Sequence, residues 1–102
     1  MKHKHSYHRE DDVWVNGERY KIRTARWFPI TNGAVYVDFP YSTDIKKYDA
    51  DGTLCGGDFY DKGAWNRDEA QARHERLLAI FLENHNCTIE NIINIIKRTE
   101  VH

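Results

Sequence analysis

The sequence predicts an α+β fold: an N-terminal antiparallel meander sheet of three to five strands, followed by two C-terminal helices packed on one face. Two observations carry this prediction. Asn-Gly and Asp-Gly pairs separate short segments rich in β-branched and aromatic residues up to residue 60. From residue 66 to residue 98, apolar residues recur at helical spacing instead. A chain of 102 residues without a Pro/Gly/Ser linker is expected to form a single domain, 1–102.

The first ten residues are a polar arm, 1–10, that contains His3, His5 and His8. A structural metal site needs ligands held apart by a turn and closed by a fourth ligand. Basic residues crowd this segment and would repel a cation. We therefore predict a frayed end or an edge strand, with no metal site, and we expect the chain to use no cofactor.

The sheet region, 13–60, begins with a hairpin at Asn16-Gly17, because this pair supplies both positive-φ positions of a type I′ turn. The strand after the turn alternates with period two, which indicates one buried face and one solvated face. Its apolar side carries Tyr20, Ile22 and Thr24, and its basic side carries Arg19, Lys21 and Arg23.

Further turns are expected at Asn32-Gly33, followed by a strand over residues 35–39, and at Asp51-Gly52. The stretch 47–58 comes near the spacing of a calcium-binding loop. Its first ligand position, however, would be Lys47, and no helix leads into it, so a plain hairpin turn is the better interpretation.

The helical region, 66–98, is predicted to form two helices. Asn66 is the expected cap of the first helix, with Glu69 at its third position, and this helix should end near Glu83. Thr88 caps the second helix, whose apolar stripe cannot stay exposed to water. The stripe consists of Ile89, Ile92, Ile93 and Ile96. It packs either on the chain's own sheet or on a second copy, so a monomer and a homodimer both remain open.

The composition points away from a membrane and from an oxidising compartment. No apolar run approaches the roughly 18 residues of a membrane span, and the first residues lack the apolar stretch of a secretory signal. Two cysteines, Cys55 and Cys87, are too few for a disulfide framework. We therefore expect reduced thiols, a cytoplasmic location and no membrane partner.

Charge is unevenly distributed along the chain, although the formal net charge is −1. Residues 1–37 carry seven basic and four acidic side chains, a net charge of +3. Residues 38–69 carry four basic and eight acidic side chains, a net charge of −4. This arrangement favours steering of a charged partner over general adhesion to nucleic acid.

The preferred hypothesis is a small non-enzymatic protein-binding module, an inhibitor that blocks a host protein or a nucleic-acid-handling complex. Six Tyr and three Trp exceed what a small core needs, and aromatic side chains anchor interfaces. Acidic turns would suit a larger partner with a basic nucleic-acid groove. In general type the chain resembles small phage and mobile-element proteins that inhibit host machinery. The expected contact residues are Asp44, Asp49, Asp51, Asp58, Asp61, Tyr41, Tyr48 and Tyr60.

Direct binding of nucleic acid is the first alternative. A sheet that displays basic and aromatic side chains can bind single strands. The residues expected to do so are Arg19, Lys21, Arg23, Arg26 and Trp27.

An enzyme centred on Cys55 is the second alternative. It would need His74 or His85 as a base and the amides of Gly56-Gly57 as an oxyanion hole. The sequence has no nucleophile-elbow or phosphate-loop motif, so we do not predict an enzyme.

Overall fold

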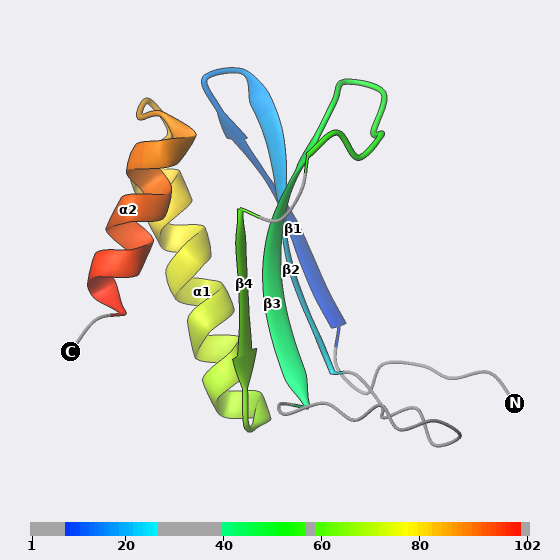
Figure 1. The fold of residues 1–102 in the computed structure, drawn as a ribbon, viewed down its shortest axis with the longest axis vertical. Coiled ribbons are helices and arrows are strands. Elements are labelled where there is room, and N and C mark those ends of the chain that lie inside the picture. The colour runs from blue at the N-terminus through cyan, green and yellow to red at the C-terminus, as the bar shows by residue number, and fades with distance from the viewer. Residues whose placement is uncertain (1–7, 27–39, 57–58, 101–102) are drawn as a thin grey trace, which may run out of the picture.

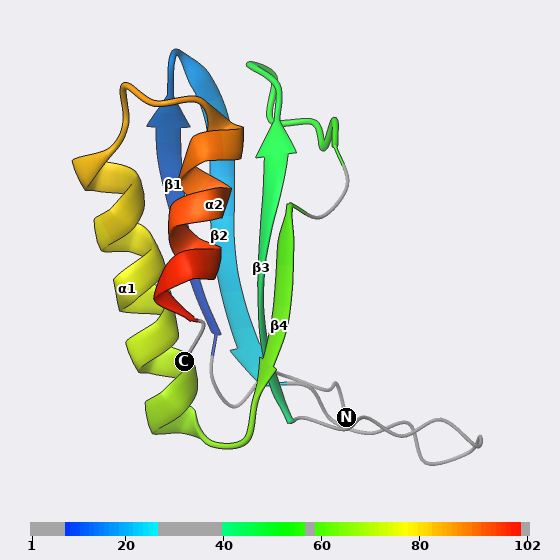
Figure 2. The same cartoon turned by 60° about the vertical axis from the view of Figure 1, so that its left-hand side comes forward.

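A computed structural model of the chain describes residues 8–26, 40–56 and 59–100. The described strands form one antiparallel sheet in the order β1-β2-β3-β4, and two helices cover one face of it (Figures 1 and 2). This architecture confirms the predicted α+β fold. The elements are β1 (His8–Val15), β2 (Glu18–Arg26), β3 (Tyr41–Tyr48), β4 (Tyr60–Ala64), α1 (Arg67–Glu83) and α2 (Ile89–Thr99).

The β1–β2 hairpin turns at the predicted pair, with φ of 52° at Asn16 and 82° at Gly17. Strand β1 starts at His8, so the last residues of the predicted polar arm belong to an edge strand, with His8 opposite Ala25. His3 and His5 lie outside the described residues. The turn expected at Asn32-Gly33 and the strand expected over residues 35–39 lie outside them as well.

The chain leaves β3 through a protruding loop, Asp49–Cys55. The Asp49 carboxylate accepts the backbone N–H groups of Asp51 and Thr53, both at 2.9 Å, and Gly52 has a φ of 86°. Leu54 then pairs with Tyr48 as an antiparallel bridge. The predicted hairpin turn is confirmed. Among the described residues, no group of three or more metal-ligating side chains gathers.

Both helices begin at the predicted caps. The Asn66 side chain accepts the backbone N–H of Glu69 at 2.8 Å, and the Thr88 hydroxyl accepts that of Asn91 at 3.2 Å. Helix α1 ends at Glu83, as expected. Among the described residues, no helix is long and apolar enough to cross a membrane.

The core lies between the sheet and the helices. It combines buried side chains from all four strands and both helices, among them Tyr20 of β2, Phe81 of α1 and Ile92 of α2. Full burial of one isoleucine side chain contributes about 1.5–3 kcal/mol to folding. Ile92, Ile93 and Ile96 of the predicted stripe are buried in this core, so the stripe packs against its own chain.

Candidate functional site

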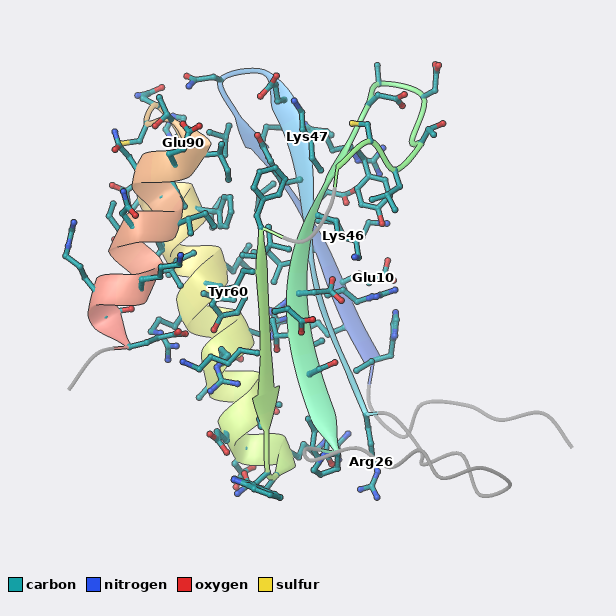
Figure 3. The ribbon with its side chains drawn as sticks, in the orientation of Figure 1. Glu10, Arg26, Lys46, Lys47, Tyr60 and Glu90 are labelled. Carbon is teal, nitrogen blue, oxygen red and sulfur yellow. The ribbon has the colours of Figure 1, made fainter. Side chains whose placement is uncertain are left out.

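The candidate site lies on the face of the sheet turned away from the helices, which we call the open face. Tyr20 and Ile22 point into the core, so alternation turns Arg19, Lys21 and Arg23 the other way. Register then assigns their cross-strand neighbours to the same face. In Figure 3, Glu10 and Lys46 project from the open face, whereas Tyr60 projects toward the helices.

The basic side chains of β2 are paired with carboxylates on neighbouring strands. Arg19 donates to Asp12 at 2.9 Å, Lys21 lies 3.2 Å from Glu10, and Arg23 donates to Asp44 at 2.9 Å. A phosphate would have to compete with these carboxylates for each cation. The pairing is set by register, which the sequence pattern does not reveal.

Arg26 and Trp27 are the other residues expected to bind nucleic acid, and Arg26 does not lie with the basic side chains of the open face. The Arg26 guanidinium lies 5.6 Å from the ring of Tyr41, opposite it in the register. Tyr41 packs with Ala64 and Ala70, so this contact is on the helix side of the sheet. Trp27 lies outside the described residues.

A row of large side chains crosses the open face near the β1–β2 turn. Trp14 of β1 lies opposite Arg19 of β2, Arg19 lies opposite Tyr48 of β3, and Tyr48 is bridged to Leu54. We call these four residues the aromatic row. Trp14 is 53% exposed and Leu54 is 49% exposed, and the Arg19 guanidinium lies 5.6 Å from the Trp14 ring. Large apolar groups are thus exposed together with an arginine.

A hollow of about 540 Å³ adjoins the aromatic row. It opens between the β1–β2 hairpin and the loop Asp49–Cys55, which protrude at the same end of the sheet (Figure 1). Lys47, labelled in Figure 3, lies at this end. The lining includes Trp14, Glu18, Arg19, Lys47, Tyr48, Asp49 and Cys55. A hollow of this size and mixed lining can hold one or two side chains of another molecule.

The acidic residues expected to contact a partner occupy different environments. Asp44 is buried and bonded to Arg23. Asp49 lines the hollow and Asp51 is exposed in the adjoining loop. Asp61 is exposed on β4, opposite Asp44. Asp58 lies outside the described residues.

The three tyrosines expected to contact a partner also differ. Tyr48 lies in the aromatic row, whereas Tyr41 and Tyr60 are buried. Trp14 and Leu54 were absent from the expected contacts. A signal for Trp14 was present, because it stands on the polar side of a strand whose apolar side carries Val13 and Val15.

His74 belongs to a buried hydrogen-bonded chain between α1 and the sheet. Its Nε2 lies 2.8 Å from Asp11 and its Nδ1 lies 2.7 Å from the Thr24 hydroxyl, which lies 2.7 Å from that of Thr43. Because an ionised carboxylate only accepts, Nε2–H donates to Asp11 and Nδ1 accepts from Thr24. Burial lowers the pKa of His74 and outweighs the bond to Asp11, which raises it.

Among the described residues, the Cys55 thiol is hydrogen-bonded to neither His74 nor His85, and Gly57 of the expected oxyanion hole lies outside the described residues. Both nitrogens of the fully buried His74 are engaged, whereas Cys55 is exposed and lines the hollow. The His85 ring lies 3.3 Å from the Leu82 carbonyl, and its own carbonyl accepts the Asn16 N–H. Cys55 and Cys87 are both free thiols.

Glu100, at the end of α2, joins α2 to β4 and α1. Its carboxylate accepts the Tyr60 hydroxyl at 2.5 Å, Lys62 at 3.2 Å and Arg76 at 2.7 Å. Burial alone would raise the pKa of Glu100, but the bonds from Tyr60 and Lys62 lower it overall. This contact has a structural role, and nothing in the local sequence pattern indicated it.

Comparison with protein-family models, curated proteins and solved structures finds no match to this chain.

Proposed function

We propose that the protein is a small non-enzymatic protein-binding module, an inhibitor that covers a functional surface of a larger partner with its aromatic row. The supporting observation is the exposure of Trp14 and Leu54 on either side of Arg19 and Tyr48. Trp, Tyr and Arg are the residue types that most often carry the binding energy of an interface.

The loop beside the aromatic row supports a basic partner surface, such as the groove of a nucleic-acid-handling protein. The loop contains Asp49 and Asp51 and no basic residue, and charge complementarity speeds association. A host protein is the proposed target. The exposed free thiol of Cys55 supports a cytoplasmic location.

Direct nucleic-acid binding is a second candidate, because Arg19 stacks on an exposed tryptophan. It is less well supported, since Arg19, Lys21 and Arg23 all have carboxylate partners. It predicts capture that is lost on nuclease treatment and that falls steeply with salt.

Capture of a partner from a lysate of the source cells tests the proposal. Trp14→Ala combined with Leu54→Ala should weaken binding by about 30-fold or more, because truncation of even one anchor residue costs about 2 kcal/mol or more. Trp65→Ala is the matched control: Trp65 is 63% exposed but lies outside the aromatic row, so capture should be unchanged. Equal capture by both variants would refute the proposed surface.

A further inference from the structure

The charged side chains around the hollow are unequally exposed. The Glu18 side chain is 53% exposed and its partner Lys47 is 31% exposed. In the neighbouring pair, Asp12 is 41% exposed and Arg19 is 28% exposed. In both pairs a larger fraction of the carboxylate side chain than of the cation side chain is exposed. Both carboxylates therefore stay accessible, and Glu18 is accessible to a molecule that enters the hollow.

The two cations that line the hollow, Arg19 and Lys47, are each hydrogen-bonded to a carboxylate of the same sheet. Arg19 donates to Asp12 and lies over the Trp14 ring, and the ammonium group of Lys47 donates to Glu18 at 3.0 Å. The hydrogen bond from Lys47 lowers the pKa of Glu18, so this carboxylate is ionised at neutral pH.

The Asp49 carboxylate retains an acceptor for an external donor. Both loop N–H groups, from Asp51 and Thr53, bond to its Oδ1 atom. Within residues 8–26, 40–56 and 59–100, no donor is bonded to Oδ2. The loop adds the exposed charge of Asp51 and has no basic residue.

The apolar part of the same surface is continuous with these carboxylates. Trp14 lines the hollow, and Leu54 follows Tyr48 along the aromatic row. An occupant that complements the whole surface therefore carries a positive group next to a large apolar group.

We infer that the hollow binds a basic segment of the protein partner, in which an Arg or Lys side chain meets Glu18 and Asp49 and an adjoining apolar side chain contacts Trp14 and Leu54. This inference rests on the proposed function and names the chemistry of the segment that docks. Charge complementarity selects this occupant over an acidic segment.

Three capped peptides test the inference: acetyl-Gly-Arg-Phe-Arg-Gly-amide, its Gln-Phe-Gln analogue and its Glu-Phe-Glu analogue. Titration is followed by NMR at the indole N–H signals, assigned with Trp14→Phe and Trp65→Phe variants. The Arg peptide should shift the Trp14 signal, leave the Trp65 signal in place and bind about tenfold tighter than the Glu peptide. This preference should shrink at 1 M salt, where the screening length falls to about 3 Å.

Two substitutions should change the affinity for the Arg peptide in opposite directions. Lys47→Gln removes the cation that competes for Glu18, so it should strengthen binding of the Arg peptide about threefold. Glu18→Gln should weaken binding by a similar factor. Because a misfolded protein cannot gain affinity at Trp14, the strengthening by Lys47→Gln separates docking from loss of structure.

Equal binding of the three peptides, tighter binding of the Glu peptide, no binding of the Arg peptide, or weakening by Lys47→Gln would overturn the inference. If capture of the partner still depends on Trp14 and Leu54 in that case, the proposed function stands and the assigned chemistry of the docking segment fails. If capture is also independent of these two residues, both fail.

Discussion

His74 is fully buried and held by two hydrogen bonds, and both positive and negative side chains lie near its ring. Asp11 and Thr24 contact its ring directly, Thr43 extends the chain, and Arg9 bonds both Asp11 and Glu75 nearby. Burial and Arg9 lower the pKa of His74, and they outweigh the two carboxylates. The fold therefore favours the neutral imidazole.

The free energy of unfolding should fall as the pH is lowered through the range just below 6.5, the ordinary pKa of histidine. The unfolded chain takes up a proton at that value, whereas the folded chain resists protonation of His74. The stability contributed by the neutral ring is thus present above pH 6.5 and lost as the pH falls toward the lowered folded pKa. Urea unfolding at pH 7.5 and 5.5 measures the difference.

His74→Gln should reduce this pH dependence and destabilise the fold at pH 7.5 by about 1–3 kcal/mol, because it disrupts a buried hydrogen-bonded chain. His85→Gln is the control, since His85 is exposed and its ring bonds only a loop carbonyl among the described residues. An unchanged pH dependence in His74→Gln would contradict this account of His74.

At the scale of elements, Glu100 fixes the end of α2 against β4 and α1. Three donors from those elements converge on a carboxylate whose side chain is 10% exposed. Glu100→Gln keeps the shape of the side chain but removes its charge, so it should lower the free energy of unfolding by about 1–3 kcal/mol. Chemical denaturation at pH 7 measures this loss.

Glu83→Gln makes the same chemical change at the exposed last residue of α1 and should alter stability by about 0.5 kcal/mol or less. Because the pKa of Glu100 is lowered, its stabilising effect is present above the ordinary value of 4.5 and is lost as the pH falls below it. Equal stability changes in the two variants would show that α2 does not depend on Glu100.

Elements with a local signal were predicted well. Asn16-Gly17 specified the first turn, and Asn66 and Thr88 specified the helix starts, because a turn or a cap depends on a few adjacent residues. Strand β3 was not placed individually, although Tyr41, Thr43 and Ile45 alternate as its buried face. Its polar and basic residues weaken the strand pattern, and pairing with β2 stabilises it nonetheless.

At the scale of the whole molecule, the candidate site depends on contacts that span the chain. The pair Trp14 and Arg19 lies about 30 residues before the pair Tyr48 and Leu54 in the sequence, and only strand register places the four in one row. Alternation within one strand shows which face a residue occupies and leaves its cross-strand neighbours undefined. The same register pairs the basic side chains Arg19, Lys21 and Arg23 with carboxylates of neighbouring strands.

The central claim is that a protein partner covers the aromatic row, and hydrogen–deuterium exchange of the complex against the free chain tests it most directly. Partner binding should slow exchange at the β1–β2 turn and in the loop Asp49–Cys55, and leave the exposed faces of α1 and α2 unchanged. Slowed exchange confined to the helices, with the turn and the loop unaffected, would contradict the account.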